Sequence, residues 1–120
     1  MGNLESDRLT ISQAVEGYIN AINLSRSKNT ARTYQNGMNL FLFTLQKAGL
    51  DPETSCTSEL DENLVTDFAD YLKRFSPATE RLYLTAAALF YEYLSAENLK
   101  DVNLARVRLL IRQRARRPGQ

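Results

Sequence analysis

The sequence has no histidine and only one cysteine, Cys56, among its 120 residues. A lone cysteine cannot close an internal disulfide, and structural zinc sites draw most of their ligands from cysteine and histidine. Serine and cysteine nucleophiles usually need a histidine as the base, so these enzyme classes lose their usual proton acceptor. We therefore expect no catalytic residues, no metal ion and no cofactor, and a reducing, cytoplasmic compartment fits the lack of disulfides.

Glycine-rich loops and long apolar runs are also absent from the sequence. The five glycines are scattered, which excludes the common phosphate-binding loops. No apolar run is long enough to cross a bilayer, and the polar opening MGNLESDRLT is not a signal peptide, so we expect no membrane partner. Carboxylates crowd residues 51–70, and a pair such as Asp67 and Asp70 could act as acid and base. On an amphipathic helix, however, such residues usually form the solvated face.

The charges are unevenly distributed along the chain, although the net charge is only +1. Residues 17–50 include four basic residues and no acidic one, residues 51–70 include seven acidic residues and no basic one, and residues 106–117 include six arginines. The near-neutral average therefore hides two basic surfaces and one acidic surface. Such a dipolar molecule can orient itself on a polyanion.

Apolar residues recur with helical spacing through most of the chain, which predicts an all-α fold, a compact bundle of four to five helices. We expect five helices. The first covers about residues 11–24, the second ends at Gly49, and the fourth covers about residues 77–96. The third begins after a cap at Asp61 and the fifth after a cap at Asn103. The buried stripe of the fourth helix is expected at Leu82, Ala86, Leu89, Phe90 and Tyr93. As boundaries we expect a flexible N-terminal arm over residues 1–9, a helical domain over 10–114 and a linker over 115–120.

Two helix starts combine cations, hydroxyl or amide side chains and exposed backbone N–H groups. The first turn of a helix carries partial positive charge and favours Asp or Glu, yet the stretch SRSKNTART has three cations and no acid. A phosphate would complete such a site, and residues in first turns reach base edges when a helix points into a major groove. The candidate DNA-binding residues are Arg26, Ser27, Lys28, Asn29, Thr30, Arg32 and Thr33 at the first start, Lys73, Arg74, Ser76, Thr79 and Arg81 at the second, and Arg108, Arg112 and Arg116 on the last helix.

A simpler explanation exists for either start taken alone. Ser, Thr and Asn are the preferred caps of any helix, and scattered Lys or Arg are usually solvated surface. Nucleic acid is favoured as the partner when three features are taken together. There are two such helix starts, the stretch around the first has no acidic residue, and the last helix is rich in arginine.

Four short motifs follow one another along the chain: Ser27-x-Asn29-Thr30-x-x-x-Tyr34, then Leu60-Asp61-Glu62-Asn63-Leu64-Val65, then Phe75-Ser76-Pro77-Ala78-Thr79, and then Leu89-Phe90-Tyr91-Glu92-Tyr93-Leu94. Their order and spacing, over about residues 10–105, resemble the N-terminal core-binding domain of the tyrosine recombinases, the phage integrase family. The resemblance implies a SAM-like bundle that forms half of a clamp around a recombination site, with the starts of the second and fourth helices facing DNA. The catalytic domain of that family has no counterpart in the sequence, and Val102-Asn103-Leu104-Ala105 stands where family members often have an Asn-Pro-Ala turn.

Two functions remain to be compared. The first is binding of double-stranded DNA, with the catalytic domain of the same parent chain as a second partner; the domain would be a monomer in isolation and the full-length parent an oligomer on DNA. If about five phosphates are engaged, the log–log salt slope of DNA binding should be about −4 to −5. The alternative is a helical protein–protein interaction module whose arginine-rich last helix docks an acidic partner or another subunit.

Overall fold

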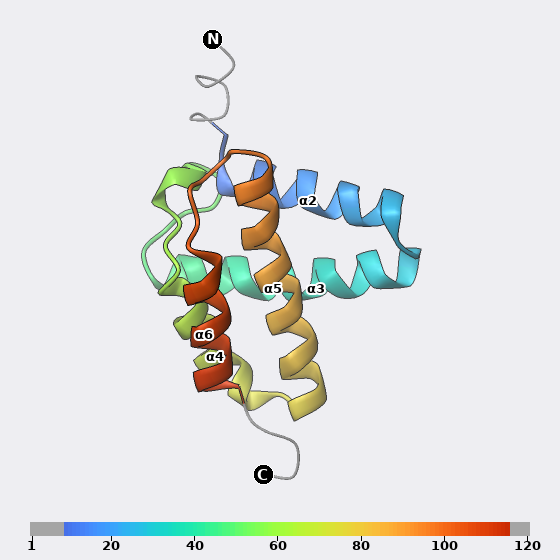
Figure 1. Cartoon of the computed structure of the whole chain (residues 1–120), viewed down its shortest axis with the longest axis vertical. Coiled ribbons are helices and arrows are strands. Elements are labelled where there is room, and N and C mark those ends of the chain that lie inside the picture. The colour runs from blue at the N-terminus through green and yellow to red at the C-terminus, as the bar shows by residue number, and fades with distance from the viewer. Residues whose placement is uncertain (1–8, 116–120) are drawn as a thin grey trace.

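In the computed structural model, which describes residues 9–115, the chain forms five α-helices and two short 3₁₀ helices and contains no strand within that range (Figure 1). The α-helices are α2 (Ile11–Ser25), α3 (Lys28–Lys47), α4 (Leu64–Tyr71), α5 (Pro77–Ala96) and α6 (Leu104–Arg114), and the 3₁₀ helices are η1 (Thr57–Glu59) and η2 (Leu72–Arg74). The expected all-α bundle of four to five helices is confirmed.

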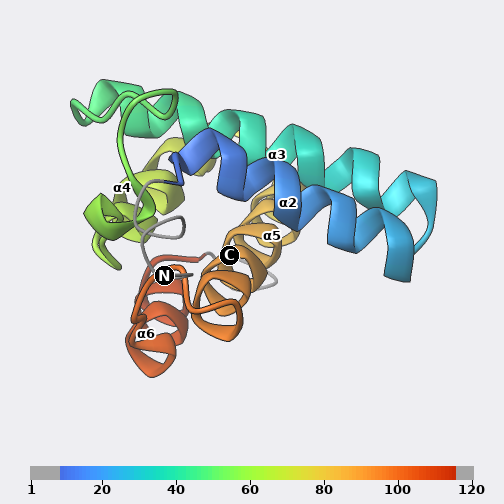
Figure 2. The ribbon, with the colours of Figure 1, turned by 90° about the horizontal axis from the view of Figure 1, so that it is seen from above.

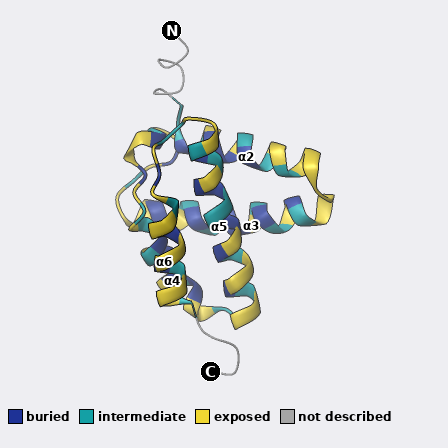
Figure 3. Ribbon diagram, in the orientation of Figure 1, coloured by how far each residue is buried: buried dark blue, intermediate teal, exposed yellow. Residues whose placement is uncertain are grey.

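The helices form two layers that cross each other (Figures 1 and 2). α2 and α3 lie side by side and antiparallel, because only Arg26 and Ser27 separate them. α5 runs across α3, and α6 returns alongside α5 with α4 next to it. The α2–α3 hairpin projects past α5, and Figure 3 shows that its far end is mostly exposed.

Local sequence signals set most of the helix boundaries. Thr10 starts α2 with a capping box, and α3 ends shortly before Gly49, whose φ of +91° suits glycine. The expectation that Asp61 directly caps the third helix needs correction, because α4 begins at Leu64. The Asp61 carboxylate accepts the N–H of Asn63 at 2.6 Å and so caps the turn that precedes the helix.

The core lies where α3, α4 and α5 meet. Phe41, Phe68, Phe90 and Tyr91 are buried there, and the ring centroid of Phe41 lies 5.3 to 6.1 Å from those of the other three. Fully burying a side chain of this size contributes about 1.5–3 kcal/mol. These rings therefore fix α3 and α5 against each other and against α4.

The buried face of α5 differs from the stripe expected from the sequence. Leu82 is 42% exposed, so its assignment to the core is wrong, whereas Glu80 is only 1% exposed. The buried residues of α5 are Glu80, Leu84, Ala86, Ala87, Phe90, Tyr91 and Leu94. The helix is apolar on more than one side, and its contacts with α2, α3, α4 and α6 decide which positions are covered. The small Ala86 lets α2 approach, and the Tyr18 hydroxyl donates to the Ala86 carbonyl at 2.8 Å.

The expected arm and linker fall almost entirely outside the described residues. Leu9, the last residue of the expected arm, packs against the core, and its carbonyl accepts the N–H of Thr57 at 3.2 Å. Ala115, the first residue of the expected linker, also packs against the core.

Candidate functional site

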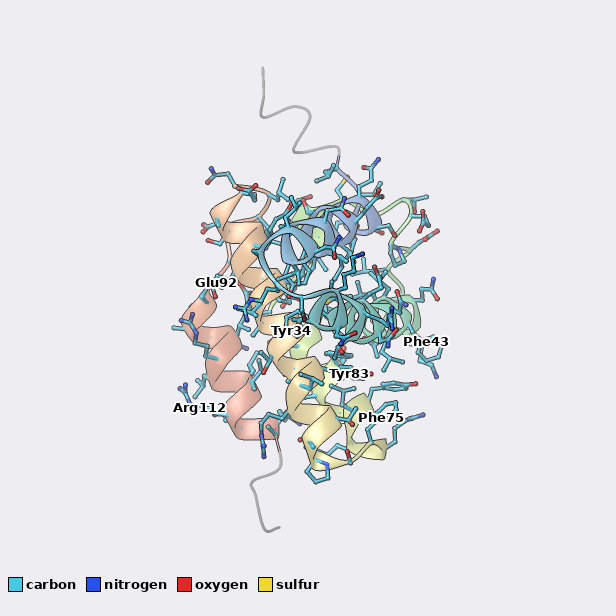
Figure 4. The ribbon with its side chains drawn as sticks, turned by 90° about the vertical axis from the view of Figure 1, so that its right-hand side faces the viewer. Tyr34, Phe43, Phe75, Tyr83, Glu92 and Arg112 are labelled. Atoms are coloured by element: carbon cyan, nitrogen blue, oxygen red, sulfur yellow. The ribbon has the colours of Figure 1, made fainter. Side chains whose placement is uncertain are left out.

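α3 and α5 come into direct contact at Gly37 and Tyr83. A Cβ atom on residue 37 would lie 2.9 Å from Cδ1 of the Tyr83 ring, so a larger residue would clash with the ring. Figure 4 shows Tyr83 on α5 below the α2–α3 hairpin. This contact adds to the packing of Phe41 against Phe90 and Tyr91, which also joins the two helices.

Residues one turn before this contact lie on the same faces of the two helices. Thr33 precedes Gly37 by one turn and Thr79 precedes Tyr83 by one turn, so each threonine lies on the face of its helix that also carries the contact. Both threonines are half-buried. We call these two helix faces, from the contact back to the helix starts, the α3–α5 corner and define it by Asn29, Thr33, Asn36, Ser76, Thr79 and Tyr83.

The two helix starts are capped in the same way. Ser27 Oγ accepts the N–H of Thr30 at 3.1 Å, and Ser76 Oγ accepts the N–H of Thr79 at 3.2 Å. In each pair the two hydroxyl oxygens are 3.0 Å apart. First-turn N–H groups point out of a helix and attract anions. α3 has no acidic residue in its first turn, and the acidic residue in the first turn of α5, Glu80, is buried.

Three of the expected cations lie around the start of α3. Arg26, Lys28 and Arg32 are exposed, and none of them forms an ion pair within residues 9–115. No acidic residue occurs between positions 17 and 50 to offset their charge locally. This end of the corner therefore has the positive potential that favours a polyanion.

Lys73 and Arg74 make contacts within the fold that the sequence did not reveal. Lys73 Nζ lies 3.9 Å from Glu80 Oε2 and donates to the carbonyl of Arg114, so it joins η2 to α5 and to the end of α6. The Arg74 guanidinium lies over the Tyr71 ring, 4.1 Å from its centroid, and its Nε donates to the Tyr71 carbonyl at 3.2 Å. The structure thus gives both cations a structural role.

Arg81 lies on a different side of α5 from the corner. Arg81 is two positions from Thr79 and two positions from Tyr83 in the sequence. Two positions correspond to a rotation of about 200° around the axis of a helix with 3.6 residues per turn. The sequence grouped Arg81 with Thr79 because they are neighbours in the chain. The fold separates them.

Arg81 instead lines a groove between α5 and α6 together with Arg108 and Arg112. Arg108 Nη2 lies 3.8 Å from Glu92 Oε2, with both side chains largely exposed. In Figure 4, Glu92 and Arg112 lie on the opposite side of α5 from Phe43. The structure therefore brings together three arginines that the sequence had placed on two separate elements.

The remaining arginines of α6 are tied to α4 or lie outside the described residues. Arg106 Nη2 donates to Asn63 Oδ1 at 2.6 Å, and Arg114 Nη1 lies 3.5 Å from Asp70 Oδ1. Arg116 is not among the residues that the structure describes. The arginine-rich helix therefore packs against the acidic segment, and one of its arginines, Arg114, forms a half-exposed ion pair with a carboxylate of that segment.

A row of aromatic side chains next to the corner was not anticipated from the sequence. The ring centroids of Phe43 and Tyr71 are 5.6 Å apart, those of Tyr71 and Phe75 6.2 Å, and those of Phe75 and Tyr83 6.4 Å. The rings line a shallow recess that also includes Asn36 and so borders the corner. They come from four separate parts of the chain, so no local pattern could have grouped them.

Within residues 9–115, no helix combines the length and the apolar character that crossing a membrane requires. The same residues contain no group of three or more His, Cys, Asp or Glu side chains arranged to hold a metal ion. Comparison of the chain with protein-family models, with curated proteins and with solved structures found no match.

Proposed function

We propose that the chain binds double-stranded DNA through the α3–α5 corner, in the manner of the core-binding domain of a tyrosine recombinase. The observation that supports this most is the contact of Gly37 with Tyr83, because it joins the two helix faces that also carry Thr33 and Thr79, one turn nearer the helix starts. In the family that the sequence resembles, the starts of the second and fourth helices face DNA. Among the described residues, α3 and α5 are the second and fourth α-helices along the chain.

The size of the corner suits one duplex. Lys28 lies about 14 Å before Gly37 along α3, and Pro77 lies about 9 Å before Tyr83 along α5, at 1.5 Å per residue. A major groove about 12 Å wide admits one helix. One helix start can therefore enter a groove while the other reaches the adjacent backbone of the same duplex.

The positive charge of the corner comes from α3, and α5 supplies neutral donors. The three exposed cations near the start of α3 would neutralise phosphates, and the Ser76 and Thr79 hydroxyls with the first-turn N–H groups of α5 would donate to phosphate oxygens. Lys73 is held by Glu80 and the Arg114 carbonyl, Arg74 stacks on the Tyr71 ring, and Arg81 lines the α5–α6 groove. We therefore expect about three neutralised phosphates rather than five, and a log–log salt slope near −3.

The test is a fluorescence anisotropy titration of the whole chain with a labelled duplex at several salt concentrations. Lys28→Gln combined with Arg32→Gln should weaken binding at low salt and reduce the magnitude of the slope by about 2. Arg108→Gln combined with Arg112→Gln is the matched control, because it removes the same charge from the α5–α6 groove. That control variant should keep the slope of the unmodified chain.

A second measurement locates the contact. In an NMR titration of the ¹⁵N-labelled chain with the same duplex, backbone amides of residues 27–33 and 76–80 should shift before all others. Binding that does not depend on salt, or an equal loss in the two double variants, would exclude the corner as the DNA surface. Circular dichroism melts of each variant separate lost binding from lost folding.

A further inference from the structure

The groove between α5 and α6 has an apolar floor. Its volume is about 390 Å³, and its floor is formed by Leu84, Ala88, Leu89, Leu104, Val107 and Ile111. Several of these side chains are only half-buried. Apolar side chains that remain half-exposed along a groove indicate a surface that a partner can cover.

The rim of the groove is basic. Arg81, Arg108 and Arg112 line it and are exposed, and Glu92 is the only acidic residue among the described residues of its lining. The ion pair between Arg108 and Glu92 is largely solvated, so it contributes little and can be exchanged for another carboxylate. The groove therefore combines an apolar floor with an excess of positive charge.

We propose that this groove docks an amphipathic α-helix of a partner protein, with Leu-type side chains toward the floor and Asp or Glu along the flanks. Leu84 and Ala88 are four positions apart on α5, and Val107 and Ile111 are four positions apart on α6. Each of the two helices therefore presents a ridge to the groove, against which a third helix can pack. Acidic flanks of the docked helix would meet the arginines of the rim. A phosphate backbone, in contrast, offers nothing to the apolar floor.

The charge of the rim also argues for a different protein rather than a second copy of this chain. α2 has one acidic residue, Glu16, and is followed by two cations, Arg26 and Lys28. α4 has Asp67 and Asp70, but its apolar face is buried in the core. Among the described residues, therefore, no helix offers an exposed apolar stripe flanked by acids.

The probe for the test is a labelled synthetic peptide of about 18 residues with leucines at positions i, i+3, i+4 and i+7, the spacing of one helix face, and glutamates beside them. Two control peptides accompany it: one has glutamine in place of every glutamate, and one has the same composition in an order without an apolar stripe. Binding is measured by anisotropy with the whole chain. The backbone amides of residues 84–92 and 104–112 should shift in a parallel NMR titration.

We expect the glutamate peptide to bind about fivefold or more tightly than the glutamine peptide, since rim charges add electrostatic attraction. The peptide without a stripe should not bind. Arg108→Gln combined with Arg112→Gln should weaken binding of the glutamate peptide about fivefold and leave the affinity for the glutamine peptide unchanged. Ala88→Leu, which fills the groove, should abolish binding of both the glutamate and the glutamine peptide. Lys28→Gln combined with Arg32→Gln should leave the affinity for both peptides unchanged.

Three results would overturn this proposal. One is equal binding of the peptides with and without a stripe, which would mean that charge alone drives association. Another is an unchanged affinity of the glutamate peptide for the Arg108 and Arg112 double variant. The third is displacement of the peptide by duplex DNA with loss of DNA affinity in that same variant, which would make the groove part of a nucleic-acid surface. The corner variant at Lys28 and Arg32 reports on the DNA proposal separately.

Discussion

Gly37 of α3 lies directly against the inner atoms of the Tyr83 ring on α5. A Cβ atom on residue 37 would lie 2.9 Å from Cδ1, 3.2 Å from Cγ and 3.5 Å from Cβ of Tyr83. These atoms are close to the backbone of α5 and cannot swing aside as the tip of a long side chain could. The pair therefore limits how closely the two helices can approach at this point.

We expect Gly37→Ala to lower the free energy of unfolding by about 1–2 kcal/mol. Overpacking of this kind costs about 1–3 kcal/mol, and it is offset in part by the gain of up to about 1 kcal/mol that alanine brings to a helix interior. Urea denaturation followed by circular dichroism measures the change. Gly17→Ala is the matched comparison, because its Cβ would meet only the hydroxyl end of the half-buried Tyr93 side chain and should cost less.

The effect of Gly37→Ala should reverse in a Tyr83→Ala background. Without the ring, the added methyl group has space, and the higher helix propensity of alanine should make the substitution stabilising. A destabilisation of the same size in both backgrounds would mean that Tyr83 is not the cause.

Lys73→Met should destabilise the fold rather than change the salt dependence of DNA binding. Its ammonium group lies 3.9 Å from the carboxylate of Glu80, which is buried, and removing the cation should cost about 1–3 kcal/mol. Glu80→Gln added to Lys73→Met should recover part of the loss, because the buried charge is then gone. If Lys73→Met keeps full stability but reduces the salt slope by about 1, Lys73 contacts a phosphate instead.

The free energy of unfolding should fall as the pH rises above about 10, the ordinary pKa of tyrosine. Burial raises the pKa of the Tyr18 and Tyr91 hydroxyls, which donate to the carbonyls of Ala86 and Asp61 at 2.8 Å. Above pH 10 the unfolded chain loses these protons while the folded chain keeps them, so stability declines by up to about 1.4 kcal/mol per pH unit for each tyrosine. The chain has six tyrosines, so the relevant signal is the part of the tyrosinate absorbance that the Tyr18→Phe and Tyr91→Phe substitutions remove, and this part should appear together with unfolding. The two substitutions combined should flatten the decline.

Glu62 should contribute stability that is lost in acid. The backbone N–H of Asn103, which bonds to Glu62 Oε2 at 2.9 Å, holds the pKa of this carboxyl below its ordinary value, with Lys100 and Arg106 adding to the effect. A depressed folded-state pKa gives stability that is present above the ordinary pKa of about 4.3 and declines as the pH falls below it. Thermal melts of Glu62→Gln should therefore differ from those of the unmodified chain at neutral pH, and the difference should shrink near pH 3.

The sequence by itself determined where most helices begin and end. Ser76 and Pro77 start α5 at the expected residue, and Gly49 lies just beyond the end of α3. Such signals are local, because a cap or a left-handed residue acts on backbone groups a few positions away. The start of α4 was misplaced because Asp61 caps a turn and not the helix itself.

Only the tertiary structure decided which face of each helix is covered and which helix starts share a surface. Leu82 is exposed and Glu80 buried, and Arg81 faces α6 while Tyr83 faces α3, although all four residues lie within a single turn of one helix. Their hydropathy cannot predict this outcome, because α5 has apolar residues on several sides and the choice among them depends on neighbours far away in the chain. The sequence therefore defined the helices, and contacts between distant residues, such as that of Gly37 with Tyr83, determined which helix faces meet.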